Sequence, residues 1–184
     1  MVLQKNLRFQ IVKKLIKKKT SLIDICGGCG WLKDYLDPSI KYTVADASKE
    51  FSKFCKSKDI SFIRLNCNNL NAIQKKFDYS VMIISLYQFR KNIKKIIKNL
   101  KKISRKKIII VEEILPIKKI DKITLFKNKI LDYLCTTNFS KENYNLFSLI
   151  EFKALMKKNN FRLINKFLKN NILVGIYETR SRKI

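Results

Sequence analysis

The most informative part of the chain is SLIDICGGCGWL, residues 21–32. Its apolar run carries one acid, Asp24, and stops at a cluster of glycines, after which apolar residues recur at helical spacing. The chain has four glycines, and Gly27, Gly28 and Gly30 are three of them. Glycine is needed where φ is positive or where backbones approach closely. A strand that enters a glycine turn and opens a helix presents backbone N–H groups to a nucleotide-like ligand.

Two other interpretations of this turn stay open. A dinucleotide-binding turn would have Gly or Ala where this chain has Lys33, and its strand does not usually carry an acid at the place of Asp24. An ordinary tight turn between a strand and a helix would bind no ligand. The spacing Cys26-x-x-Cys29 also occurs in zinc and redox sites, but a second pair of ligands is missing from the sequence.

The stretch resembles motif I of the class I S-adenosylmethionine (SAM)-dependent methyltransferases, which reads apolar-apolar-acid-apolar-Gly-x-Gly-x-Gly. Asp24 matches the acid, Gly28 and Gly30 match the second and third glycines, and Cys26 stands where the first glycine is usual. The doublet Gly27-Gly28 is most similar to the Asp-x-x-Gly-Gly-x-Gly form of the quinone C-methyltransferases. The resemblance implies that SAM is the cofactor and that S-adenosylhomocysteine is the product.

Length and composition predict one folded domain over residues 1–184, because 46% of the residues are hydrophobic and the chain is long enough to bury a core. No apolar run approaches the ~20 residues of a membrane span. No secretory signal peptide is visible. The five cysteines are an odd number without regular spacing, as in proteins that keep their thiols reduced. A cytoplasmic location is therefore expected.

The chain contains no histidine, which excludes Ser-His-Asp and Cys-His relays, His-bound metals and imidazole acid–base chemistry. We expect no metal site, and the sequence assigns no catalytic residue. Methyl transfer is compatible with this restriction. A sulfonium is already a good leaving group, so much of the acceleration can come from aligning donor and acceptor.

The formal charge of +27 arises from 41 Lys and Arg against 14 Asp and Glu. A protein this basic associates with polyanions at low salt, whether or not that is its function. The basic residues are spread along the whole sequence instead of forming one segment. Nucleic acid therefore stays open as a partner, beside a small-molecule acceptor.

Residues 1–19 have the pattern of a basic amphipathic helix, since Leu3, Leu7, Ile11 and Leu15 share one face. We expect this helix to cover the sheet before the first strand. An arm that binds RNA or a membrane surface is the alternative.

The pattern of Lys41–Asp46 predicts a second strand with an acid at its carboxyl end. An acid about twenty residues after the glycines can accept hydrogen bonds from both ribose hydroxyls. The run VADAS over 44–48 resembles the Val-Asp-x-Ser element of the family, which implies that Asp46 binds the ribose. The alternative is that Asp46 caps the N-terminus of a helix over 47–56.

A third strand is expected over Ile60–Leu65, followed by Asn66 and Cys67. Many family members have Asp and a small residue here, on either side of the adenine. The resemblance implies that the Asn66 carbonyl accepts from the adenine amino group and that the Cys67 N–H donates to the ring. An ordinary Asn-rich turn is the alternative.

Two nearly continuous apolar runs, Phe77–Leu86 and Lys107–Glu113, are typical of strands buried on both faces, and a lysine-rich helix over Lys91–Ile103 separates them. Ligands of such sheets lie beyond the carboxyl ends of the strands, where Ile84 is expected to join the site. The expected cofactor-binding residues are Asp24, Cys26, Gly28, Gly30, Asp46, Asn66, Cys67 and Ile84.

The segment 116–147 is expected to be a helical, lid-like insertion, where the resemblance implies that acceptor specificity is set. A helix over Phe147–Met156 and two strands, 162–168 and 172–177, complete the pattern, with an Asn-Asn turn suited to a hairpin. The sequence therefore predicts an α/β fold. This is a single doubly wound, mostly parallel, seven-stranded sheet of the Rossmann-like methyltransferase type, with an antiparallel C-terminal edge hairpin.

The function that the resemblance implies is SAM-dependent methyl transfer to a small-molecule acceptor, apolar or quinone-like. One alternative is an RNA methyltransferase that uses the basic surface. Another is a non-catalytic module with this fold that binds RNA or a protein. Methyltransferases that modify the amino group of adenine carry an Asn/Asp-Pro-Pro-Tyr/Phe motif, and this chain lacks it.

Overall fold

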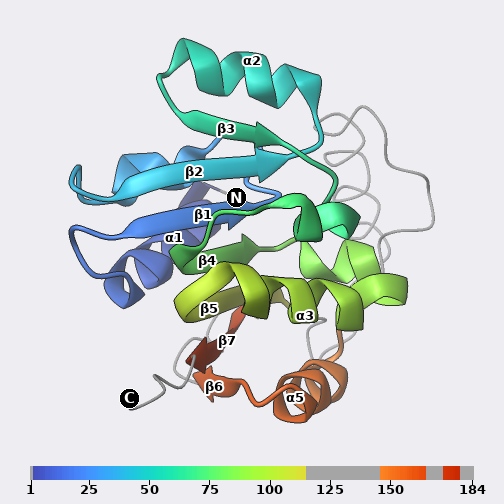
Figure 1. The fold of residues 1–184 in the computed structure, drawn as a ribbon. Coiled ribbons are helices and arrows are strands. Elements are labelled where there is room, and N and C mark those ends of the chain that lie inside the picture. Colours follow the sequence, from blue (N-terminus) through green and yellow to red (C-terminus); the bar gives the residue numbers. More distant parts are fainter. Residues whose placement is uncertain (1, 115–145, 165–171, 179–184) are drawn as a thin grey trace, which may run out of the picture.

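The computed structural model describes residues 2–114, 146–164 and 172–178, which form a seven-stranded sheet with helices on both faces (Figure 1). The strand order is β3-β2-β1-β4-β5-β7-β6. The strands are β1 (Ser21–Ile25), β2 (Lys41–Asp46), β3 (Ser61–Arg64), β4 (Phe77–Ile83), β5 (Ser104–Glu113), β6 (Arg162–Ile164) and β7 (Ile172–Glu178). Strands β1 to β5 pair in parallel, whereas β7 is antiparallel to β5 and β6. The expected fold, including its C-terminal hairpin, is confirmed.

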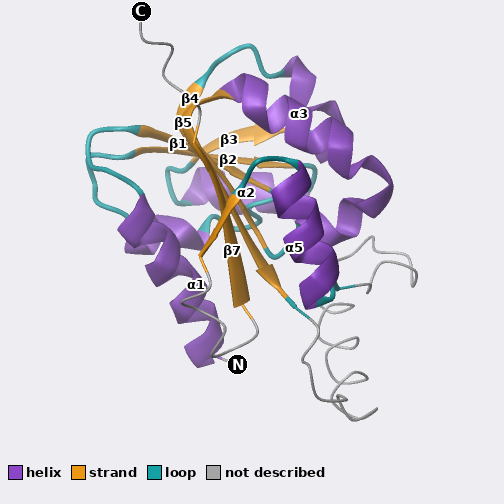
Figure 2. Cartoon of the chain, turned by 90° about the horizontal axis from the view of Figure 1, so that it is seen from below, coloured by secondary structure: helices purple, strands orange, loops and turns teal. Residues whose placement is uncertain are grey.

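Helices cover the two faces of the sheet, and each face has its own hydrophobic core. The helices are α1 (Val2–Leu15), α2 (Lys49–Ser57), α3 (Ile93–Ile103) and α5 (Leu149–Lys158), with 3-10 turns η1 (Trp31–Tyr35), η2 (Cys67–Ala72) and η3 (Leu86–Asn92). Figure 2 shows α1 on one side of the sheet and α3 and α5 on the other. Buried residues of α1, η1 and α2 form one core, and those of η2, α3 and α5 form the other.

The strands bury both faces, which explains their nearly continuous apolar runs. In β1, Leu22 belongs to the core under α1, and its neighbour Ile23 belongs to the core under α3. The period of two along the strand places Asp24 on the α1 face. On α1 the side chains of Ile11 and Val12 are buried, so the N-terminal helix covers the sheet as expected. No helix in the described ranges has the length and apolar character that a membrane crossing requires.

The helix expected after the glycine turn is only a 3-10 turn of five residues, η1. It stops because Leu36 is extended, with φ −84° and ψ 154°, and because Pro38 disfavours the helical conformation of the residue before it. The N-terminal helix is also shorter than expected: it ends at Leu15, and Lys19 has a positive φ of 55°.

Two strand ends differ by three residues from the sequence prediction. Strand β4 ends at Ile83, because Ile84 adopts a left-handed φ of 49° and the chain turns into η3. Strand β5 begins at Ser104, which directly follows α3. The Ser104 hydroxyl donates to the carbonyl oxygen of Leu100 (2.6 Å) and lies 2.7 Å from Oγ of Ser80, so it stabilises this abrupt junction.

The order of the strands reverses at β1. The chain proceeds from β1 outward to β2 and β3, then returns to place β4 on the other side of β1. The carboxyl ends of β1 and β4 therefore diverge at a topological switch point, which is where open α/β sheets bind their ligands.

Ile114 and Phe147, which lie on either side of the segment 115–145 in the sequence, form a parallel bridge just beyond the carboxyl end of β5. The expected lid over 116–147 lies almost entirely outside the described residues and stays a prediction. The single-domain organisation of residues 1–184 also stays a prediction.

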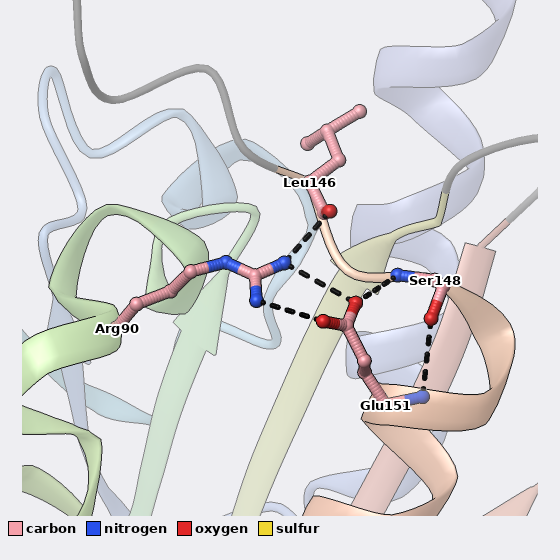
Figure 3. A network of polar contacts seen from close by, with 4 residues as sticks. All are labelled: Arg90, Leu146, Ser148 and Glu151. Carbon is pink, nitrogen blue, oxygen red and sulfur yellow. Dashed lines mark hydrogen bonds and ion pairs between the residues drawn. The ribbon is translucent and has the colours of Figure 1, made fainter.

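A cluster of polar contacts fixes the chain where it leaves this segment (Figure 3). Arg90, in η3, donates from Nη2 to the carbonyl oxygen of Leu146 (2.8 Å) and pairs through Nη1 with Glu151 of α5 (3.2 Å). Ser148 and Glu151 form a capping box at the start of α5. The cluster therefore joins the loop after β4 to the first turn of α5.

Candidate functional site

Two residues with unusual backbone conformations flank the switch point. Cys26, directly after β1, has φ 58°, and its N–H donates to the carbonyl oxygen of Ala45 (2.7 Å). Ile84, directly after β4, has φ 49°, and its N–H donates to the carbonyl oxygen of Val111 (2.7 Å). A positive φ is a genuine outlier for a β-branched residue and costs about 1–3 kcal/mol. Such strain clusters at functional sites, and Cys26 and Ile84 are the two of the five described non-glycine residues with positive φ that lie at the expected ligand position.

The glycine turn closes tightly after Cys26. The Gly30 N–H donates to the carbonyl oxygen of Gly27 (2.9 Å), and Gly28 and Gly30 have φ values of 56° and 71°. Gly27 matters for a different reason, which the sequence did not reveal. A Cβ at this position would lie 2.7 Å from Cγ and 2.8 Å from Oδ2 of Asp24. Gly27 therefore makes room for the Asp24 carboxyl group.

Asp24 is 3% exposed and only partly satisfied. Its Oδ2 accepts a hydrogen bond from the Tyr42 hydroxyl (2.7 Å), whereas its buried Oδ1 has no hydrogen-bond partner among the described residues. Burial raises the pKa of Asp24 to about 7, against the opposing effect of the Tyr42 hydrogen bond. A ligand cation or N–H donor at Oδ1 would favour the ionised form.

Helix α1 brings a positive charge close to this carboxyl group. Partial burial lowers the pKa of Arg8. The nearby negative charges of Glu113 and Asp24 act in the opposite direction, because they favour the charged guanidinium. The buried Nε of Arg8 makes no hydrogen bond within the described ranges. The N-terminal helix thus contributes to the electrostatics of the site as well as covering the sheet.

Asp46 connects the glycine turn to the start of α2. Its Oδ2 accepts from the N–H of Gly28 (3.2 Å), and its Oδ1 accepts from the N–H of Ser48 (3.0 Å). The N-cap of α2 is Ser48, whose Oγ accepts from the N–H of Phe51 (3.1 Å). The alternative role of Asp46 as the N-cap is therefore wrong. Each carboxylate oxygen of Asp46 keeps a second lone pair for a ligand hydroxyl.

The loop after β3 reaches the glycine turn through Cys67. This residue is 4% exposed, and a hydrogen bond between the Cys67 and Cys26 thiols raises the pKa of Cys26. Asn66 caps η2, since its Oδ1 accepts from the N–H of Asn68 (2.9 Å). The Asn-rich turn considered from the sequence therefore accounts for this side chain, which still has acceptor capacity left.

Glu112, at the end of β5, is a site residue that the sequence analysis missed. It is completely buried, and its Oε1 accepts from the N–H groups of Ser85 (3.0 Å) and Leu86 (2.6 Å). Its Oε2 has no hydrogen-bond partner in the described ranges. Burial raises the pKa of Glu112 to about 8. The signal was an acid inside a run of β-branched residues, where an unpaired charge is costly.

A family profile described as methionine biosynthesis protein MetW matches residues 6–179. The chain belongs to the MetW family. Together with the fold, this membership confirms the class I methyltransferase relationship that Asp24, Gly28 and Gly30 indicated. The quinone-type interpretation of Gly27-Gly28 stays a prediction.

Solved structures share the fold of this MetW-family chain. The CurJ carbon methyltransferase matches with a TM-score of 0.68 and 13% identity, over 94% of this chain and 54% of that one. The mitomycin 7-O-methyltransferase MmcR matches with a TM-score of 0.66 and 14% identity, over 94% and 56%. The PH0226 protein from Pyrococcus horikoshii OT3 matches with a TM-score of 0.65 and 17% identity, over 97% and 91%. This chain therefore spans just over half of CurJ and MmcR. A comparison with curated proteins finds no match.

The MetW-family chain brings most of the expected residues to the switch point. Asp46 accepts from the N–H of Gly28, and the thiols of Cys26 and Cys67 form a hydrogen bond. The charge of Asp46 also acts on the pKa of Asp24 and of Cys26. Ile84 and Cys26 pack against the same core. Gly30 has a different position: a Cβ there would lie 3.1 Å from side-chain atoms of Val44 and Ile60, so this glycine packs on the sheet.

Proposed function

We propose that this chain transfers a methyl group from SAM to a small-molecule acceptor. The observation that carries the proposal is Oδ1 of Asp24, a buried carboxylate oxygen without a partner in the described residues, beside a glycine turn at the switch point. Buried polar groups are normally satisfied, so such an oxygen suits a ligand donor. The methionyl ammonium of SAM is a donor of the right charge.

The described residues fit the rest of the cofactor. Asp46 accepts from both ribose hydroxyls with the lone pairs that Gly28 and Ser48 leave unused. Gly28 lets the backbone approach closely because it has no side chain. Asn66 and Cys67 lie at the start of η2. From there they would frame the adenine.

SAM, when bound, supplies a methyl group that is activated by its sulfonium. The chain contributes binding, orientation and exclusion of water. Because the sequence has no histidine, any acid–base step would use a carboxylate, Lys, Tyr or Cys. Ile84, directly after β4, and Cys26, directly after β1, would flank the reacting centre. The rigid turn that Glu112 holds fixes the position of Ile84.

A small, apolar or quinone-like acceptor is the favoured class. CurJ and MmcR carry the names of a carbon and an O-methyltransferase. In this chain, Ile114 and Phe147 meet at the carboxyl edge of the sheet, and the segment between them is proposed to cover an acceptor there. The charge of +27 favours a second candidate, methyl transfer to RNA or binding of RNA without catalysis.

Cofactor choice gives the first test. S-adenosylhomocysteine at about 100 times its Kd should raise the melting temperature by about 5–10 °C, and NAD should leave it unchanged. Differential scanning fluorimetry measures both. Stabilisation by NAD, without any by S-adenosylhomocysteine, would contradict the methyltransferase proposal and favour a dinucleotide-binding turn.

Asp46→Ala should weaken binding of S-adenosylhomocysteine by about tenfold to a hundredfold, since hydrogen bonds to a charged acceptor contribute about 1.5–3 kcal/mol. Isothermal titration calorimetry measures the affinity. Ser48→Ala is the matched control, because it removes the N-cap of α2 and keeps the Asp46 carboxylate. An equal loss of affinity in both variants would assign Asp46 a structural role only.

A further inference from the structure

A pocket of about 320 Å³ lies between η1 and α2, on the side of the sheet that α1 covers. Its lining includes Trp31, Lys33 and Asp34 from η1 and Phe54 and Lys58 from the end of α2. The volume is at the lower end of the ~300–1,000 Å³ range of small-molecule sites.

The pocket is separate from the proposed cofactor site. Neither Asp24 nor Asp46 lines it, and Gly30 is the one proposed cofactor residue in its lining. Gly30 contacts Val44 and Ile60 on this side of the turn. The two sites therefore share only this glycine.

Two exposed aromatic rings line this pocket. Trp31 is 47% exposed and Phe54 is 39% exposed. Among the described residues only one other large hydrophobic side chain is exposed, Ile150 on α5, which covers the opposite face of the sheet. Large rings are mostly buried in folded proteins, so two exposed rings in one pocket indicate a binding surface.

The polar side chains of the pocket complement a nucleotide. Lys33 and Lys58 form no salt bridge with an acid in the described ranges, so both ammonium groups are available to phosphates. The Asp34 carboxylate repels phosphate and instead accepts from the amino groups at the edge of a base. Aromatic rings beside cations are the platform on which proteins stack single-stranded bases.

We propose that a single-stranded nucleic acid docks at this pocket, with a base stacked on Trp31 and Phe54 and its phosphates on Lys33 and Lys58. The charge of +27 draws the polyanion to the protein, and the pocket gives it a defined contact. A duplex hides its base faces and does not fit. The proposal goes beyond methyl transfer to a small molecule and deepens the second candidate function, binding of RNA without catalysis.

The single tryptophan of the chain reports directly on this pocket. A single-stranded RNA of about 12 nucleotides, close to the site size of known single-strand binders, should quench the Trp31 fluorescence, and the matching duplex should not. With fluorescently labelled RNA, Trp31→Ala and Phe54→Ala should each raise the Kd about tenfold to a hundredfold. Ile150→Ala, at the other exposed hydrophobic residue, should leave the Kd unchanged.

Charge-matched variants separate the pocket from the overall basic surface. Lys33→Gln with Lys58→Gln should weaken binding of this RNA at least tenfold more than Lys153→Gln with Lys157→Gln, two exposed lysines of α5. Equal losses in the two pairs would show that net charge alone binds RNA and would overturn the proposal. Equal affinity of the RNA and of free nucleoside monophosphates would also overturn it.

The change in melting temperature that S-adenosylhomocysteine produces in the same variants distinguishes the RNA-docking proposal from the methyltransferase proposal. Trp31→Ala and Phe54→Ala should keep the shift of the wild type. A chain that binds RNA at this pocket without any such shift would be a nucleic-acid-binding protein only. If S-adenosylhomocysteine still raises the melting temperature but both variants bind RNA as tightly as the wild type, the proposed cofactor site stands and the proposed RNA site is wrong.

Discussion

Glu112→Ala should be among the most destabilising single substitutions in this protein. It leaves the buried N–H groups of Ser85 and Leu86 without an acceptor, at about 1–3 kcal/mol each, and adds a cavity next to the core. The melting temperature should fall by roughly 5–20 °C, at about 2–4 °C per kcal/mol for a chain of this size. Chemical denaturation followed by circular dichroism measures the free energy of unfolding.

Glu112→Gln is the matched control, because the amide keeps a carbonyl oxygen for both N–H groups and removes the ionisable group. The folded-state pKa of Glu112, about 8, is higher than its ordinary value of 4.5. Protonated Glu112 therefore stabilises the fold fully below about pH 4.5, and this contribution is lost as the pH rises through about 8. Over that interval the wild type should lose stability relative to Glu112→Gln at up to about 1.4 kcal/mol per pH unit. If the free energy of unfolding depends on pH in the same way in the wild type and in Glu112→Gln, Glu112 is not a buried, protonated group.

The sequence was informative wherever a local pattern determined the structure. The second strand, Lys41–Asp46, has the bounds that its pattern predicted. The antiparallel pairing of β6 and β7 follows from two short strand-like runs, and the glycine turn follows from three of the four glycines in the chain. The Asn-Asn turn and the end of the predicted strand 162–168 lie outside the described residues and stay a prediction. These features depend on local propensities that one stretch of sequence contains.

Features that depend on contacts between distant strands could not be predicted in the same way. Nothing near Ile84 in the sequence indicates a positive φ, because the strain is held by a hydrogen bond to Val111 on the neighbouring strand. Gly27 is required by the position of Asp24, and Asp24 is in turn held by Tyr42 on β2. Such pairs become visible only when the register of β1 and β2 is known.

The other large effect that we expect is a steep dependence of cofactor affinity on pH. Asp24 must be ionised to bind the methionyl ammonium, but its pKa in the free protein is about 7 because the group is buried. The affinity for S-adenosylhomocysteine should therefore rise about tenfold per pH unit from pH 5 to about 7, and then level off. Calorimetry in buffers of different ionisation enthalpy measures the affinity and the release of about one proton at pH 6.

The same pKa makes the ligand-free protein sensitive to pH. Asp24 has a folded pKa of about 7 against an ordinary value of 3.8, so its protonated form stabilises the fold fully below about pH 3.8 and this contribution is lost as the pH rises through 7. S-adenosylhomocysteine should reverse this trend, since its ammonium compensates the buried carboxylate. The thermal shift that it produces should consequently be larger at pH 8 than at pH 6.

Two variants and one ligand test whether Asp24 is the group responsible. Asp24→Asn should weaken binding at pH 8 and remove the pH dependence. Tyr42→Phe deletes the hydrogen bond to the carboxylate and so raises the pKa of Asp24. The pH at which the affinity for S-adenosylhomocysteine levels off should therefore be higher in this variant. 5′-Methylthioadenosine lacks the amino-acid part of the cofactor and should bind the wild type with little pH dependence. If it follows the same steep profile as S-adenosylhomocysteine, the titrating group acts on the nucleoside, and Asp24 does not hold the ammonium.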